Sequence, residues 1–231
     1  MLNQIKNDLQ KLGNPKLAKI LSRFFKTGKG EYGYGDVFLG IKVGPQRKIV
    51  KKYSQATLKD LQKLLSSKIH EERLTSLFIL IDKYKKADEK NKKEVVDFYL
   101  KNTKNINNWD LIDLSAGKIL GNYLLEKDKS ILYKLAKSNS VWERRIAIMS
   151  TFEFIRNNKF ESTLKISEML LEDKHDLVHK AVGWMLREIG KRNQAVEEKF
   201  LKKHYKKMPR TMLRYAIERF DESKRKYYLS K

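Results

Sequence analysis

Apolar residues recur at steps of three and four along most of the chain, the spacing that places them on one face of an α-helix. Representative runs are Leu61, Leu64 and Leu65, and Leu74, Leu77, Phe78 and Ile81. No sustained alternation of period two, the pattern of a half-buried strand, interrupts them. The pattern therefore predicts an all-α protein of about a dozen helices joined by short turns.

The middle of the chain repeats with a period of about 36 residues, a length typical of stacked helical repeats. The two clearest columns of this repeat are Leu77, Asp113, Met149 and Met185, and, three residues earlier, Leu74, Asp110, Ile146 and Val182. Two aspartates thus interrupt two otherwise apolar columns. The repeat predicts a single domain over residues 1–231, built as a curved solenoid with a concave basic face. An irregular helical bundle is the alternative.

Six of the eleven glycines fall within Gly28–Gly44, which we interpret as an irregular loop anchored by Val37–Leu39. The letters of Gly28–Gly33 fit the dinucleotide-binding fingerprint. That fingerprint requires a strand before it and a helix start after it. A helix is expected before it here, so we interpret the match as accidental.

The charge balance is strongly basic, with 51 Lys and Arg against 28 Asp and Glu and a formal net charge of +23. Such a surface attracts polyanions, of which nucleic acid is the commonest. It also repels a second copy of itself, so a monomer is expected. The alternative is a protein from a generally basic proteome, in which a high charge indicates no particular partner.

Cysteine is absent, which excludes disulfides and thiolate chemistry and fits a reducing compartment. No apolar run approaches the roughly 18 residues of a membrane span, and the N-terminus lacks the apolar stretch of a signal peptide. The sequence therefore predicts a soluble cytoplasmic protein of prokaryotic type, associated with the nucleoid and without a membrane partner.

The two aspartates share one helix face next to Trp109. Asp110 is expected in the first turn after a cap at Asn107 or Asn108, where the helix dipole favours acids. This explanation does not extend to Asp113, which lies beyond the first turn. A lone carboxylate in a basic cleft can stabilise a cationic reaction centre or orient water. We therefore expect Asp113 to face such a cleft without a counter-ion.

The tryptophans and a pair of arginines each allow two interpretations. Trp109, Trp142 and Trp184 either pack in the core or present an indole to a sugar or base. Arg144 and Arg145 open a helix, where they either form salt bridges or bind phosphate through the guanidinium fork.

His175 and His179 are four residues apart and could share a helix face. A zinc site needs further ligands, and the H-E-x-x-H pattern is missing. The sequence therefore predicts no metal site.

Four stretches together resemble the alkylpurine DNA glycosylases with HEAT-like repeats, of the AlkD type. They are Gly35–Ile41 with the following Arg47–Ile49, Asn108–Asp113, Trp142–Ile148 and Lys180–Glu188. The most specific part is the combination of W-D-x-x-D in the second stretch with G-W-x-L-R-E in the last. The resemblance implies a HEAT-like solenoid over nearly the whole chain.

The resemblance also implies roles for individual residues. Asp113 matches the family's catalytic carboxylate, and Trp109 and Trp184 match aromatics that contact the deoxyribose of the lesion. The DNA contacts that it implies are Arg145, or the adjacent Arg144, for a phosphate, and Arg187.

An enzyme of this family excises cationic N3- or N7-alkylated purines from double-stranded DNA, as a hydrolase of the N-glycosidic bond in base excision repair. The cationic base leaves without a general acid, so the resemblance implies no metal and no cofactor. The family is understood to capture the DNA backbone and leave the base stacked. The alternative is a non-catalytic helical-repeat protein that binds DNA or RNA structure or acidic partners.

Overall fold

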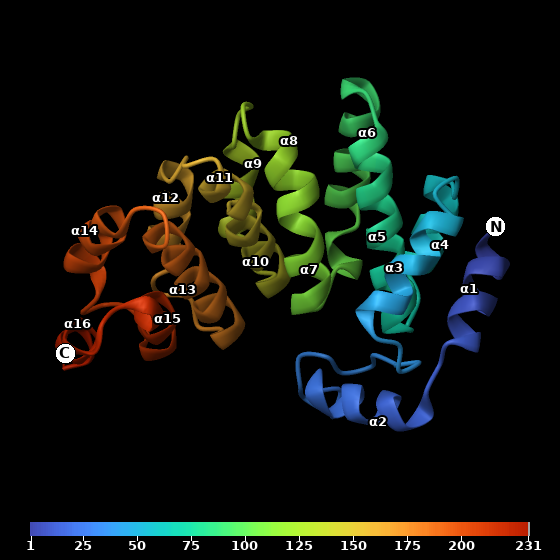
Figure 1. The fold of residues 1–231 in the computed structure, drawn as a ribbon, viewed down its shortest axis with the longest axis horizontal. Helices are drawn as coiled ribbons and strands as arrows, with labels where there is room; N and C mark the ends of the chain where they lie inside the picture. Colours follow the sequence, from blue (N-terminus) through green and yellow to red (C-terminus); the bar gives the residue numbers. More distant parts are fainter. Residues whose placement is uncertain (231) are drawn as a thin grey trace. The chain divides into compact units, whose positions relative to one another are not determined.

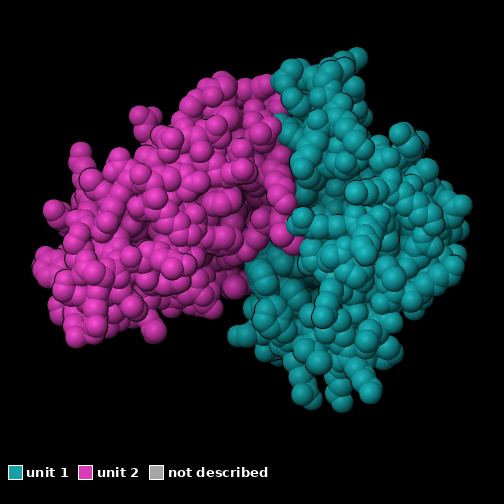
Figure 2. Space-filling view, viewed as in Figure 1, with its two compact units in different colours: residues 1–111 teal, residues 112–231 magenta. Residues whose placement is uncertain are grey.

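The computed structural model describes residues 1–230 and consists of helices and short connections (Figure 1). It divides into two compact units, Met1–Leu111 and Ile112–Lys231, which Figure 2 colours teal and magenta. The predicted all-α fold is confirmed. Within the described chain, no helix is both long enough and apolar enough to cross a membrane.

The first unit is built around the long helix α5, against which α3, α4 and α6 pack. Its helices are α1 (Leu2–Lys11), α2 (Pro15–Phe24), α3 (Val43–Lys52), α4 (Leu58–Leu65), α5 (His70–Lys86), α6 (Glu89–Lys101) and the short 3-10 turn Thr103–Asn105. Helix α7 (Trp109–Ala116) contains the boundary between the two units.

The second unit is built around α13, which contacts α10, α14 and α15. After the π-helical segment Gly117–Gly121, its helices are α8 (Asn122–Leu124), α9 (Ser130–Ala136), α10 (Val141–Ser150), α11 (Phe152–Arg156), α12 (Glu161–Met169), α13 (Asp176–Gly190), α14 (Gln194–His204), α15 (Arg210–Ala216), the 3-10 turn Ile217–Arg219 and α16 (Glu222–Leu229).

Helix starts follow local chemistry that is visible in the sequence. Pro15 opens α2 behind the cap of Asn14, because a first-turn residue needs no N–H donor. Pro45 lies in the first turn of α3, and Pro209 immediately precedes α15. Thr57 and Asp60 form a reciprocal capping box at α4.

The apolar members of both repeat columns are buried. They lie on α5, α10 and α13, and are Leu74, Leu77, Ile146, Met149, Val182 and Met185. The period of about 36 residues therefore identifies equivalent core positions of successive repeats. The two aspartates of the columns lie on α7.

The glycine-rich segment is irregular as predicted, but it ends at Lys42, because α3 already begins at Val43. Val37 pairs with Ile69 in a β-bridge, and the Glu71 carboxylate accepts backbone N–H bonds from Leu39, Gly40 and Ile41. Gly40 has a φ of +82°, a conformation that other residues rarely adopt. A buried acid thus fixes the shape of this loop.

Helices α13 and α15 approach closely at Gly183. A Cβ added there would overlap the carbonyl oxygen of Met212 and lie 2.5 Å from Tyr215 Cβ. Neither group lies at the end of a flexible side chain. The contact therefore fixes α15 against the helix that carries Trp184.

Replacing Gly183 by alanine should destabilise the protein by about 1–3 kcal/mol through overpacking. The melting temperature should fall by roughly 2–4 °C for each kcal/mol. The matched variant is Gly44→Ala in α3, where the added Cβ meets no atom within 4 Å. A Gly183→Ala protein that melts with wild type and Gly44→Ala would contradict the close approach.

Candidate active site

The stretch that carries both column aspartates is the start of α7. Asn108 precedes the helix and its Oδ1 accepts the N–H of Trp109 at 2.8 Å. Asp110 lies in the first turn, as predicted from the helix dipole. Trp109 and Asp113 are one helical turn apart on this helix.

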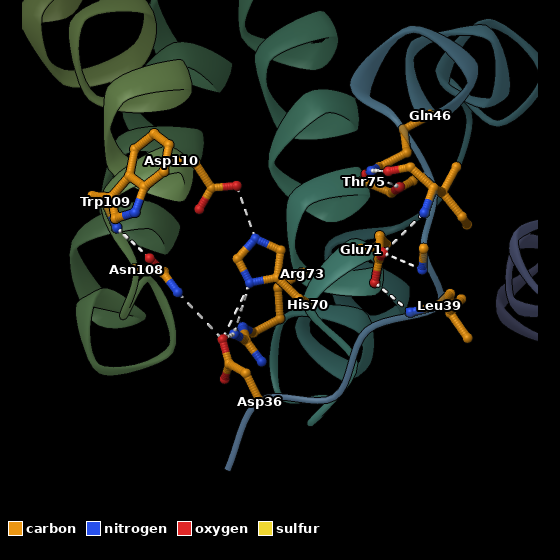
Figure 3. A network of polar contacts seen from close by, with 12 residues as sticks. Asp36, Leu39, Gln46, His70, Glu71, Arg73, Thr75, Asn108, Trp109 and Asp110 are labelled. Carbon is orange, nitrogen blue, oxygen red and sulfur yellow. Dashed lines mark hydrogen bonds and ion pairs between the residues drawn. The ribbon is translucent and has the colours of Figure 1, made fainter. Parts of the chain in front are cut away.

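Asp110 is buried and bonded to a histidine that sequence reasoning did not select. Its Oδ2 lies 2.8 Å from Nε2 of His70, and Nδ1 of the same ring lies 3.1 Å from Oδ2 of Asp36 (Figure 3). Arg73 donates to the same oxygen of Asp36 at 2.6 Å. The His70 ring therefore bridges the glycine-rich loop and α7.

The electrostatics of this network favour a charged imidazole. Burial lowers the pKa of His70, but hydrogen bonds to Asp110 and Asp36 outweigh it, so the net shift is upward. Burial raises the pKa of Asp36, but its bonds to His70 and the charge of Arg73 bring it below the ordinary value. The network thus favours a proton on both ring nitrogens of His70, between Asp110 and Asp36.

Trp109 is partly buried in an aromatic cluster of the first unit. Its ring stacks on Phe25 at 5.2 Å between centroids and meets the edge of Phe24 at 5.8 Å. Phe25 in turn stacks on Phe38 at 5.1 Å. Core packing therefore holds the indole, while part of it remains accessible.

The prediction that Asp113 has no counter-ion is wrong. Arg145 donates from Nε to Oδ1 at 2.9 Å and from Nη2 to Oδ2 at 2.8 Å. The Asp113 side chain is only 12% exposed and the Arg145 side chain only 5%. The physical reason is desolvation, because a largely buried carboxylate is costly unless a cation pairs with it.

Arg144 and Arg145 both form salt bridges, which is one of the two roles that the sequence allowed for them. The third bond of Arg145 goes from Nη1 to the carbonyl of Leu177. Arg144 pairs with Asp173, with Nε 2.5 Å from Oδ2, and also donates to the Ser138 carbonyl. Any phosphate contact by these guanidinium groups must coexist with these bonds or replace them.

Trp184 and Arg187 lie one turn apart on α13 and are each held by an acid. The indole Nε1 of Trp184 donates to Glu188 Oε1 at 3.1 Å. The Trp184 side chain is partly exposed, and the centroids of its ring and the Phe152 ring are 6.2 Å apart. Arg187 pairs with Glu218. The third tryptophan, Trp142, lies partly buried in the first turn of α10.

The two histidines of the second unit serve local structure. His175 caps α13, since its Nδ1 accepts the N–H of Leu177 at 3.1 Å. The Nε2 of His179 is hydrogen-bonded to the carbonyl of Asp173. These contacts account for both rings without a ligand.

Comparison with known proteins gives a matching family, and the similar solved structures include a protein from Enterococcus faecalis and one from Streptococcus mutans. A model of the family described as DNA alkylation repair enzyme matches residues 5–220. A predicted DNA alkylation repair enzyme from Enterococcus faecalis has a TM-score of 0.70 and 16% identity, over 91% of this chain and 97% of that one. AlkD2 from Streptococcus mutans has a TM-score of 0.56 and 18% identity, over 89% and 98%. At these identities the two structures establish the helical-repeat fold alone. No curated protein matches the sequence.

Proposed function

Because the chain belongs to the DNA alkylation repair enzyme family, whose members act on DNA, we propose that it is a DNA glycosylase that excises cationic N3- or N7-alkylated purines from duplex DNA. In this proposal Asp113 is the catalytic carboxylate, and Trp109 and Trp184 contact the deoxyribose. Arg145, Arg144 and Arg187 are the proposed contacts to the DNA backbone.

The observation that carries the proposal is the presence of Asp113, paired with Arg145, at an otherwise apolar position. Equivalent residues Leu77, Met149 and Met185 are fully or almost fully buried. A hydrophobic residue would suit this position for packing alone. The chain instead holds a carboxylate there through a bidentate bond to Arg145, one turn from Trp109. An aspartate that is costly for stability is expected where chemistry requires it.

The proposed chemistry needs few groups. When the bond between C1′ and the purine nitrogen breaks, its electron pair neutralises the cationic base, which therefore leaves without a proton donor. Positive charge develops on the deoxyribose, and the Asp113 carboxylate stabilises it. A water molecule held by the same carboxylate adds its oxygen to C1′ and releases a proton. The indoles of Trp109 and Trp184 add cation–π stabilisation of about 0.5–2 kcal/mol each.

Arg145 has a double role in this proposal. Its bonds to Asp113 and Leu177 use three of the five guanidinium N–H groups. The two bonds to Asp113 hold its carboxylate in one orientation. In this proposal the two remaining N–H groups make the contact to a phosphate oxygen, so that contact does not require the salt bridge to break.

Incubation with methylated duplex DNA tests the proposal. We expect free 7-methylguanine or 3-methyladenine to appear, measured by chromatography of the small-molecule fraction, and none from unmethylated duplex. Protein that binds the methylated duplex but releases no base would contradict the glycosylase proposal.

A non-catalytic DNA-binding protein is the second candidate, and one observation favours it. The paired Arg145 cancels much of the field of Asp113 beyond contact distance. Under this alternative the pair only joins α7 to α10. Binding to duplex without base release is its expected result in the same experiment.

A further inference from the structure

The second unit contains a charged pocket that has no role in the function proposed above. It has a volume of about 420 Å³, and its lining residues lie on α13, α15 and α16 and in the turn after α15. Figure 1 labels these three helices in the C-terminal part of the chain. Three basic side chains line the pocket, Lys180, Arg214 and Arg225, against the two acids Asp176 and Glu218.

Both acids of the pocket already have partners. Asp176 pairs with Lys180 at 2.6 Å. Glu218 pairs with Arg187, which is not one of the residues that line the pocket. Burial alone would raise the pKa of Asp176, but hydrogen bonds from Lys180 and Thr211 lower it. Neither carboxylate therefore needs a further cation.

The two remaining arginines have no such partner. Arg214 on α15 and Arg225 on α16 are exposed, and neither forms an ion pair with another residue in the described part of the chain. Tyr215 belongs to the same lining. The pocket thus holds two unpaired guanidinium groups, a donor set suited to an anion with several oxygens.

The position of the pocket relative to Trp184 is set by the packing of α15 on α13. Gly183 of α13 lies against the Met212 carbonyl and Tyr215 of α15. Trp184 follows Gly183 directly, and Arg214 precedes Tyr215. A ligand bound by Arg214 is therefore held in a defined register with Trp184.

We propose that this pocket binds a phosphodiester of the DNA backbone through Arg214 and Arg225, and so sets the register of the duplex against Trp184. The inference rests on the proposed action on DNA and adds a specific anchoring site to it. Phosphate contacts of this kind fix position and orientation without reading the base sequence.

The test is the salt dependence of binding to an unmethylated duplex, which requires no catalysis. Each phosphate contact contributes about 0.9 to the slope of log affinity against log salt concentration. The double variant Arg214→Gln/Arg225→Gln should lower this slope by about 1.8 and weaken binding at low salt by roughly 10-fold or more.

The control variant is Arg219→Gln/Lys206→Gln, which removes the same charge from exposed residues outside the pocket lining. Melting temperatures establish that both variants fold. An equal change of slope in both would attribute the effect to net charge and overturn the proposal. An unchanged slope in the pocket variant would also overturn the proposal. This holds even if inorganic phosphate, titrated separately, binds wild type but not the pocket variant. Wild type that binds duplex with the expected slope but releases no base would contradict only the glycosylase proposal.

Discussion

Replacing Asp113 by asparagine should lower the rate of methylpurine release about 100-fold or more, while binding to duplex DNA persists. Asparagine keeps the shape of the side chain and removes the charge that stabilises the developing cation. Loss of one such preorganised electrostatic group costs about 100- to 1,000-fold in other enzymes. Single-turnover release from methylated duplex is the measurement, because it reports the chemical step without product release.

The salt bridge makes a stability control necessary. Asparagine at position 113 leaves Arg145 buried without its carboxylate, which costs up to about 3–5 kcal/mol when a buried pair is broken. Asp173→Asn breaks the comparable pair with Arg144, in which the Asp173 side chain is 3% exposed. We expect both variants to melt earlier, but only Asp113→Asn to lose release by that factor. Equal losses in the two variants would show that the effect is structural.

The sequence predicts the fold well where the signal is local or periodic. The spacing of apolar residues gives the helices, and the columns through Leu77 and Met149 identify buried positions on different helices. Asn14 and Pro15 mark the start of α2 because a cap and a missing N–H are properties of neighbouring residues.

The sequence does not predict which residues far apart in the chain pair with one another. Asp113 and Arg145 are 32 residues apart, and either could have been solvated. His70 is a single histidine at the start of an apolar helix, and its partners lie 34 and 40 residues away. A column of buried residues implies that an acid in it needs a counter-charge. This rule could have predicted that Asp113 has a cationic partner, but it does not identify Arg145 as that partner.

The burial of Glu197 is another feature that the sequence does not predict, and it has a measurable consequence. It lies among lysines and acids in α14, a context that suggests an exposed helix face, yet it is only 1% exposed. A Cβ at Gly190 would overlap its carboxyl oxygen, so the glycine makes room for this side chain. Its Oε1 has no hydrogen-bond partner. Burial of this kind is unfavourable for the ionised form.

The carboxyl group should therefore remain protonated at neutral pH. Burial, reinforced by the negative charge of Glu198 and opposed by Arg187, raises the pKa of Glu197 from 4.5 to about 8. In the unfolded chain the group ionises near its ordinary value. Between these two pH values the folded state holds a proton that the unfolded state has released, so the free energy of unfolding falls as pH rises.

Replacing Glu197 by glutamine should remove this component of the pH dependence. Below about pH 4.5 the group is neutral in both states and contributes no slope; above about pH 8 it is ionised in both and the loss is complete. At about 1.4 kcal/mol per pH unit, the difference between the wild-type and variant curves should grow by at most about 5 kcal/mol over that interval. Urea unfolding at several pH values measures this difference, in which the contributions of His70 and the other groups cancel.

The difference is independent of what the amide itself does to stability. Glutamine brings N–H groups that need partners in a buried place, so the absolute free energy of unfolding can move in either direction. That offset is constant with pH, because the amide does not titrate. Glu172→Gln, at an exposed position outside the helices, removes the same charge and should give a curve parallel to wild type. If the Glu197→Gln curve also runs parallel to wild type between pH 4.5 and 8, Glu197 is ionised in the folded protein at neutral pH, and its burial is compensated by a partner.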